Sequence, residues 1–379
     1  MIRVGTTATI NEMNTLSALK RLRLFFRVFL FEKLFLGVIA RSGYERIWHI
    51  IGGHIFFHTL VTSVEVGLFD LLHTEGALTQ TQIAEKLHLE QKPVRILLLG
   101  LTSLRLLDKT GDRYALTYLS HRYFVSSSPF NIRAVLAWQK RINYKAMFHL
   151  TEAVEQNTNV GLMEFAGTER TLYERLEHTP DLNQIFQDAM RDISKQAATQ
   201  LAEYLDTSGS AYLVDVGGGN GTVLMSLARK NPRLRGAVMD LASIEAISTE
   251  NIRHHGFTDT LEFVPGNCFS DPFPKKADML LFCHFFTIWS EEKNTQLLKK
   301  CYEALPAGGK VVLFNMMQRD TEDGPLSAAM GSPYFLTLAT GEGMLYCWRD
   351  YERWMRAVGF TKIQKFVLPT DHGIIVAEK

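Results

Sequence analysis

Hydrophobic positions follow two different periods along the chain, and the period changes near residue 205. From about residue 16 to 205, apolar residues recur at the three- and four-residue spacing that predicts amphipathic helices. From residue 210 onward, short apolar runs alternate with helical stretches, a pattern typical of a doubly wound, mostly parallel sheet. The predicted strands are 212–216, 236–239, 261–264, 279–283, 311–314 and 373–377. The predicted helices in this half are 222–230, 243–254, 291–305 and 348–358.

The pattern therefore predicts two domains, a helical one over 1–205 and an α/β one over 206–379. Within the helical part, residues 64–120 have the order of a winged helix, with a capped helix at 78–87, a second helix from Lys92 and a hairpin over 110–112. In a transcription factor the second helix would contact DNA. Here that helix is mostly leucine and isoleucine, so we expect it to pack inside the protein.

Residues 20–45 form a strongly apolar segment that follows a tail at 1–15. Arg27, Glu32 and Lys33 interrupt the segment, so it falls short of the roughly 18 apolar residues expected of a membrane span. The favoured interpretation is a helix buried against a partner subunit. Two alternatives remain open, a basic helix lying on a membrane surface and a helix packed within its own chain.

Composition argues against several classes of protein. A net charge of +1 argues against nucleic acid as the main ligand. The four cysteines show neither a metal-binding spacing nor a disulfide pattern, and the N-terminus lacks a signal-peptide cleavage site. We therefore expect a cytoplasmic protein without a bound metal.

The most informative stretch is residues 212–221, Tyr-Leu-Val-Asp-Val-Gly-Gly-Gly-Asn-Gly, where an apolar run and an acid lead into a glycine-dense turn. Gly217, Gly219 and Gly221 let the backbone approach a ligand closely, because glycine has no Cβ. A second acid, Asp240, ends the next apolar run, at about the spacing where ribose hydroxyls are bound. These features predict a Rossmann-like domain that binds a nucleotide cofactor.

With Asp215 ahead of it, the turn resembles motif I of S-adenosylmethionine-dependent methyltransferases. Further segments resemble the plant-type O-methyltransferase family, which includes bacterial enzymes that act on polyketides, indoles, phenazines and pigments; these segments are 186–190, 240–241, 266–269, 277–292 and 305–313. The resemblance covers about residues 45–379 and implies a homodimer formed by the helical domain, with S-adenosylmethionine as cofactor. The cofactor-binding residues that it implies are Ser194, Asp215, Gly217, Gly219, Gly221, Asp240, Leu241, Asn267, Cys268, Phe269, Cys283 and Trp289.

The chain departs from this family where proton transfer takes place. The family carries Lys-x-x-x-His-Asp-Trp after the fourth strand, but Cys283 replaces the lysine and Thr287 the catalytic histidine, while Trp289 persists. Leu345 stands where a glutamate orients that histidine. A neutral threonine hydroxyl cannot act as a general base.

Three explanations are open. Another histidine, His284 or His149, acts as the base. Alternatively the methyl acceptor is carbon, as in the bacteriochlorophyllide C-20 methyltransferases, which the segment Leu281-Phe-Cys-His resembles. In the third, the protein does not methylate and uses bound S-adenosylmethionine as a fixed positive charge for pericyclase- or hydroxylase-like chemistry.

The expected substrate is a bulky aromatic or polyketide-like small molecule. Aromatic and methionine residues in the helical part, together with Met330, are predicted to surround it. The predicted substrate-binding residues are Trp138, Phe148, Phe186, Met190 and Met330, and the predicted catalytic positions are His284, His149 and Thr287.

Overall fold

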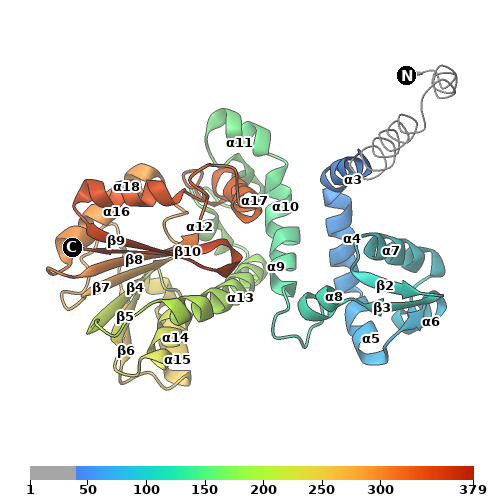
Figure 1. The fold of residues 1–379 in the computed structure, drawn as a ribbon, viewed down its shortest axis with the longest axis horizontal. Coiled ribbons are helices and arrows are strands. Elements are labelled where there is room, and N and C mark those ends of the chain that lie inside the picture. The colour runs from blue at the N-terminus through green and yellow to red at the C-terminus, as the bar shows by residue number, and fades with distance from the viewer. Residues whose placement is uncertain (1–39) are drawn as a thin grey trace, which may run out of the picture. The chain divides into compact units, whose positions relative to one another are not determined.

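The computed structural model describes residues 40–379, which divide into two compact units, one ending at Asn131 and the other spanning Ile132–Lys379 (Figure 1). The predictions made for the tail and for most of the apolar segment, residues 1–39, lie outside the described residues.

The N-terminal unit contains the predicted winged helix. Its helices are α3 (Ala40–Ile51), α4 (Gly53–Glu65), α5 (Leu68–Glu75), α6 (Gln80–Leu87), α7 (Gln91–Ser103) and α8 (Tyr118–Tyr123). Its strands β1 (Leu78–Thr79), β2 (Leu107–Thr110) and β3 (Arg113–Leu116) pair in the order β1-β3-β2. Thr79 begins α6 with a reciprocal capping box to Gln82, which explains why the start of this helix was visible in the sequence. The winged-helix prediction is confirmed.

Within residues 40–379, no single helix is long and apolar enough to cross a membrane. The segments Gly43–Ile51 and Gly53–Glu65 satisfy the length and composition criteria only as a pair, and they are bent by 67° relative to each other.

The C-terminal unit is built on a seven-stranded sheet with the order β6-β5-β4-β7-β8-β10-β9. The strands are β4 (Tyr212–Val216), β5 (Arg235–Asp240), β6 (Leu261–Pro265), β7 (Met279–Cys283), β8 (Lys310–Met316), β9 (Thr361–Val367) and β10 (His372–Glu378). Strands β4 to β8 run parallel, and only β10 runs in the opposite direction, because it pairs antiparallel with both β8 and β9; the predicted mostly parallel sheet is confirmed. Both faces of the central strands are buried, which accounts for their continuous apolar runs.

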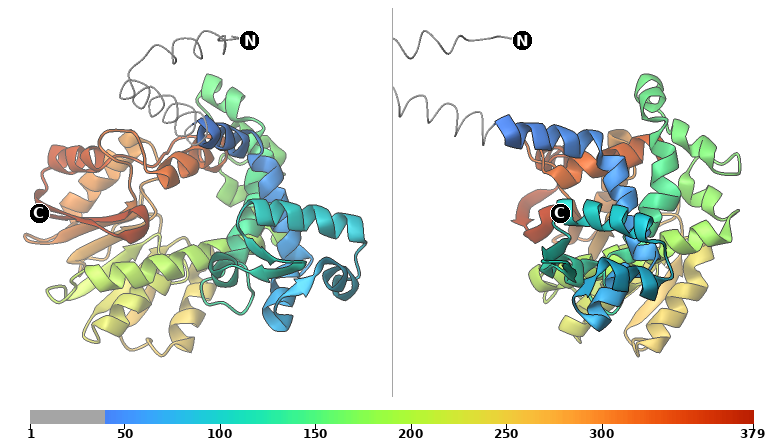
Figure 2. Two further views of the ribbon diagram at one scale, coloured as in Figure 1. Left: turned by 45° about the vertical axis from the view of Figure 1, so that its right-hand side comes forward. Right: turned by 90° about the vertical axis from the view of Figure 1, so that its right-hand side faces the viewer.

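Helices cover both faces of this sheet (Figure 2). On one side lie α13 (Pro180–Tyr204), α14 (Thr222–Lys230) and α15 (Glu245–His254), after the short helix η4 (Ala242–Ile244). On the other lie α16 (Glu291–Ala304) and α18 (Trp348–Val358). A further short helix, η6 (Pro369–Asp371), precedes β10.

A cluster of helices before β4 and after β8 completes the C-terminal unit. It contains α9 (Arg133–Trp138), α10 (Tyr144–Met147), α11 (Leu150–Gln156), α12 (Leu172–Leu176) and α17 (Leu326–Tyr334), the 3-10 helix η3 (Val160–Glu164), and the π-helices η2 (Gln139–Asn143) and η5 (Phe335–Ala339). Residues 132–205 thus group with the sheet, and the division between the compact units falls before the boundary expected at 205. The reason is α13, whose Ala197, Ala198 and Leu201 are part of the core under the sheet.

Candidate active site

The turn between β4 and α14 is tied to the end of β5. Gly219 has a φ of +56°, and its N–H donates to Oδ2 of Asp240 at 2.9 Å. Oδ1 of Asp240 accepts a hydrogen bond from the N–H of Leu241 at 2.7 Å. Strands β4 and β5 are parallel neighbours, so their carboxyl ends bring the predicted cofactor residues together at one edge of the sheet.

Asp215 is a buried carboxyl without a hydrogen-bond partner on either oxygen. Burial, and secondarily the charge of Asp240, raises the pKa of Asp215 to about 7. Burial also raises the pKa of Asp240. The carboxyl of Asp215 lacks hydrogen-bond partners and that of Asp240 is partly desolvated. These two neighbouring acids therefore favour a ligand that carries positive charge.

The loop after β6 holds the third predicted cofactor segment. Oδ1 of Asn267 accepts the N–H of Phe269 at 2.9 Å, which shapes the turn and leaves a second lone pair for a ligand. Cys268 is buried. The Phe269 ring meets Trp289 edge-on at 5.0 Å between centroids. Sequence reasoning missed Phe285, whose ring lies 6.2 Å from each of these two rings and packs against Gly217, where an added Cβ would lie 2.6 Å from it.

At the end of β7, Cys283 and His284 are both uncharged. Burial, and then the nearby Asp215, raises the pKa of the Cys283 thiol well above its usual value. His284 has a φ of +52°, its ring lies 5.1 Å from that of His372, and its inaccessible Nε2 has no partner. Burial, reinforced by His372, lowers the pKa of His284 to about 3, so this imidazole is a weak base.

The position where the family resemblance places the catalytic base is buried. Thr287 is 1% exposed and its Oγ1 donates back to the carbonyl of His284 at 3.3 Å. Leu345, in the place of the orienting glutamate, is also buried. Two hydrogen bonds join the segment after Thr287 to the segment around Leu345. Thr340 Oγ1 donates to the carbonyl oxygen of Ile288 at 2.5 Å, and the Tyr346 hydroxyl donates to the carbonyl oxygen of Trp289 at 2.7 Å. Neither position offers a group that exchanges a proton near neutral pH.

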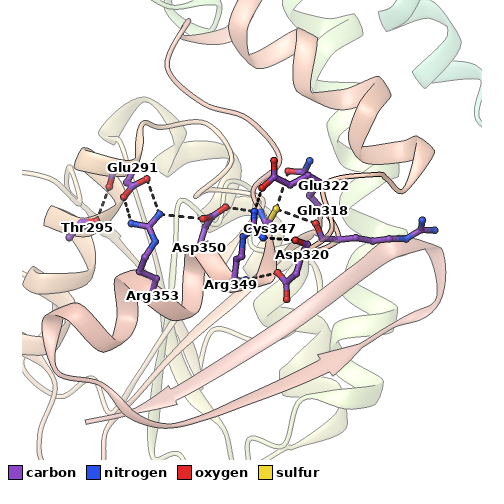
Figure 3. A network of polar contacts seen from close by, with 10 residues as sticks. Glu291, Thr295, Gln318, Asp320, Glu322, Cys347, Arg349, Asp350 and Arg353 are labelled. Atoms are coloured by element: carbon purple, nitrogen blue, oxygen red, sulfur yellow. Dashed lines mark hydrogen bonds and ion pairs between the residues drawn. The ribbon is translucent and has the colours of Figure 1, made fainter.

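A polar network holds the segment after Leu345 in place (Figure 3). Sγ of Cys347 donates to Gln318 Oε1 at 3.3 Å, in the loop after β8. Arg349 and Arg353 extend the network to Asp320 and Glu291, and Arg353 reaches both carboxylate oxygens of Glu291, at 2.5 and 3.0 Å. The start of α18 is thus attached to two other elements, so Leu345 has a fixed position.

Three of the predicted substrate residues meet in one apolar cluster. Phe186 is part of it, and Trp138 and Met190 pack against it. Ser194, a predicted cofactor residue, lies one helical turn after Met190 on the same side of α13.

The structure does not bring Phe148 and Met330 into that cluster, because the two side chains are 81% and 72% exposed. Each follows a buried alanine, Ala146 or Ala328, by two residues. A spacing of two places side chains on opposite sides of a helix, so both residues point to solvent.

His149 is paired with Glu164, which the sequence did not single out. Nε2 of His149 and Oε1 of Glu164 are 2.8 Å apart, and both side chains are partly buried. A carboxylate that binds one ring nitrogen fixes the tautomer and leaves the other nitrogen as the base. The 15-residue separation explains why no local motif revealed the pair.

Across residues 40–379, no group of three or more His, Cys, Asp or Glu side chains is arranged to hold a metal ion.

Two family models match the chain. One, described as an O-methyltransferase domain, covers residues 147–361, and the other, described as an O-methyltransferase dimerisation domain, covers residues 48–126.

Individual relatives agree with these matches. The chain is 34% identical to the L-tyrosine C(3)-methyltransferase of Streptomyces lavendulae, over 88% of this chain and 93% of that protein. It is 30% identical to the 3-hydroxy-5-methyl-1-naphthoate 3-O-methyltransferase of Streptomyces sahachiroi, over 85% of this chain and 91% of that protein. The crystal structure of the S-adenosylmethionine-dependent methyltransferase SibL, without ligand, superposes with a TM-score of 0.79 at 32% identity, covering 87% of this chain and 98% of that one.

Proposed function

The chain belongs to the O-methyltransferase family and is an S-adenosylmethionine-dependent methyltransferase, and from this premise we propose that it methylates a ring carbon beside the phenolic hydroxyl of a small aromatic molecule. The observation that carries the proposal is the buried Thr287 and Leu345 where the family resemblance places a histidine and a glutamate. The tyrosine C(3)-methyltransferase, a relative that acts on carbon, supports the same choice.

The residues around the glycine turn fit the cofactor, which supplies a methyl group on a positively charged sulfur. An added Cβ on Gly219 would meet no atom within 4 Å, so the backbone leaves space there. The unpartnered oxygens of Asp215 favour a cationic neighbour. We propose that Asp240 accepts hydrogen bonds from the ribose hydroxyls, and that Asn267, Phe269 and Trp289 contact the adenine.

A carbon nucleophile explains why no base is needed beside the methyl group. In the proposed reaction the ring carbon bonds to the methyl carbon while the carbon–sulfur bond breaks and its electron pair stays on sulfur. The same ring carbon then loses its hydrogen as a proton, which restores the aromatic ring. A phenol oxygen, whose pKa is about 10, would instead gain about 10²–10⁴ in rate from a base during the attack.

We propose that His149 accepts the ring proton and that Glu164 positions it. His149 has a carboxylate partner at 2.8 Å that orients its imidazole ring. His284 is less suited, because its pKa is lowered to about 3. Since the proton leaves after the methyl group has been transferred, its acceptor need not lie beside Thr287.

The site of methylation tests this function directly. The enzyme is incubated with S-adenosylmethionine carrying ¹³C in its methyl group and with L-tyrosine or 3-hydroxy-1-naphthoate as acceptor. Carbon NMR of the product is expected to show a methyl group bonded to the ring, with S-adenosylhomocysteine formed in equal amount. A methoxy signal in its place would contradict the proposal.

A further inference from the structure

One face of helix α15 contacts the glycine turn between β4 and α14. Ser248, Asn251 and Ile252 are separated by three and four residues, so their side chains lie on the same side of α15. Ser248 and Ile252 are buried, and α14 and α15 lie side by side on one face of the sheet (Figure 1). These three residues lie outside the turn and outside the set assigned to the cofactor, so they act on the ligand only through the turn.

The carbonyl oxygen of Asn220, in the middle of the turn, is bonded to this face. Nδ2 of Asn251 donates to it at 2.8 Å, across 31 residues of sequence. The N–H at the other end of the same peptide group, that of Gly221, donates to the carbonyl oxygen of Gly218 at 3.0 Å. Because a peptide group is planar, hydrogen bonds at both of its ends fix its orientation.

Gly221 packs closely against the same elements. Its φ is +78°, in the left-handed region that favours glycine. A Cβ there would lie 3.2 Å from Val238 Cγ2 in β5, and 3.7 Å from both Ile252 Cγ1 and Ser248 Oγ in α15. The backbone of the turn therefore approaches β5 and α15 directly, and the hydrogen bond from Asn251 holds it at the closest part of this contact.

The order of the strands indicates which end of the cofactor the turn faces. Under the proposed function, the loop after β6 contacts the adenine, and Asp240 at the end of β5 contacts the ribose. The sheet continues in the order β6-β5-β4, and in S-adenosylmethionine the ribose links the adenine to the amino-acid end. The turn after β4 thus faces the amino-acid end, beside Asp215, whose unpartnered oxygens favour a positive charge.

We propose that Asn251 is a positioning residue for the cofactor. By holding the carbonyl of Asn220, it keeps the turn in the shape that binds the amino-acid end of S-adenosylmethionine. A turn already held in its binding shape loses less conformational entropy when the ligand binds, so the affinity is higher. This inference rests on the cofactor contacts of the proposed function, but it does not depend on which atom of the acceptor is methylated.

Two ligands that differ only at the amino-acid end test the inference. The full-length protein is titrated calorimetrically near neutral pH with S-adenosylhomocysteine and with 5′-methylthioadenosine, which keeps the adenosine and the sulfur but lacks the amino acid. Asn251→Asp and Asn251→Leu both remove the amide donor and keep the approximate size of the side chain. In each, the Kd of S-adenosylhomocysteine is expected to rise about tenfold, and that of methylthioadenosine to change less than about twofold, because only the first ligand reaches the turn.

Asn231 provides the matched control. Its Nδ2 also donates to a backbone carbonyl oxygen, that of Thr207 at 3.2 Å, and its side chain is also partly buried, but it follows the opposite end of α14. The same two substitutions at Asn231 are expected to leave the ratio of the two Kd values at that of the wild type. A loss of general stability would affect both ligands alike, so the ratio separates positioning of the turn from a structural role.

Three results would overturn the inference. The first is an unchanged Kd of S-adenosylhomocysteine in the Asn251 variants, or an equal rise for both ligands. The second is the same selective loss in the Asn231 variants. The third is a wild type that binds S-adenosylhomocysteine but not methylthioadenosine, because the adenine and ribose contacts would then not bind independently of the amino-acid end.

The two proposals fail separately. Methylation on oxygen would contradict the carbon acceptor and leave the selective loss in the Asn251 variants intact. Equal losses for the two ligands would contradict the role of Asn251 and leave the product's NMR spectrum unchanged.

Discussion

At the scale of single residues, the carboxyl of Asp215 makes the stability of the protein depend on pH. Its pKa is about 7 in the folded, cofactor-free protein, against about 3.9 in an unfolded chain. The folded state therefore holds a proton that the unfolded state has already released between these values. The stabilising contribution of this group is complete below about pH 4 and is lost as the pH rises through about 7.

We predict that the melting temperature of the cofactor-free protein falls more steeply over this interval in the wild type than in Asp215→Asn. Asparagine does not titrate and keeps the size of the side chain. Parallel curves for the two proteins, measured by calorimetry from about pH 4 to 8, would show that Asp215 is ionised in the folded state.

A second prediction at this scale concerns the pair of His149 and Glu164. Glu164→Gln removes the negative charge beside the imidazole but keeps a hydrogen-bonding oxygen 2.8 Å away in the wild type. Because Glu164 is proposed to orient the ring that accepts the proton, kcat should fall several-fold, with KM changed much less than kcat. An unchanged kcat, or a kcat and a KM changed by the same factor, would contradict the positioning of His149 by Glu164.

At the scale of elements, the β4–α14 turn offers a matched pair of glycines. Gly219 and Gly256 both have positive φ, +56° and +74°, and an added Cβ would meet nothing within 4 Å at either position. Alanine at either site should therefore destabilise the protein similarly, by about 1 kcal/mol from backbone strain.

Only Gly219→Ala should also weaken cofactor binding, because its Cβ projects where the turn approaches the ligand. We expect at least a tenfold increase in the Kd of S-adenosylhomocysteine, measured by calorimetry, with Gly256→Ala close to wild type. Equal affinities in the two variants would remove the turn from the cofactor site.

The elements differ in how far the sequence predicted them. Strand β4 could be predicted because all five of its residues are buried and therefore apolar or unusual in sequence. Helix α6 could be predicted because Thr79 caps its start. Strand β9 was missed, since it is an edge strand whose residues are almost all exposed and show no alternation. The π-helices and the pairing of His149 with Glu164 depend on tertiary contacts that no local pattern encodes.

At the scale of the whole molecule, apolar side chains on the N-terminal unit indicate a partner. Ile47, Trp48 and Ile51 of α3 and Ile96 and Leu99 of α7 are all more than half exposed. A family model for dimerisation covers 48–126, and such patches mark interfaces when they are contiguous.

We therefore predict that the full chain is a homodimer in solution. Sedimentation equilibrium should give twice the chain mass of 43.0 kDa. Replacing Leu99 by lysine should shift the equilibrium toward the monomer, since a charge on an apolar interface is costly to bury. A wild-type protein that sediments as a monomer at micromolar concentration would contradict this assembly.

The central claim is transfer to a ring carbon at a site without a base beside the methyl group. It is tested most directly with L-tyrosine or 3-hydroxy-1-naphthoate that carries deuterium at the ring positions next to the hydroxyl. Mass spectrometry of the product should show one added methyl group and the loss of one deuteron, because the carbon that gains the methyl must release its hydrogen. A methylated product that keeps every deuteron would place the methyl on oxygen and contradict the account.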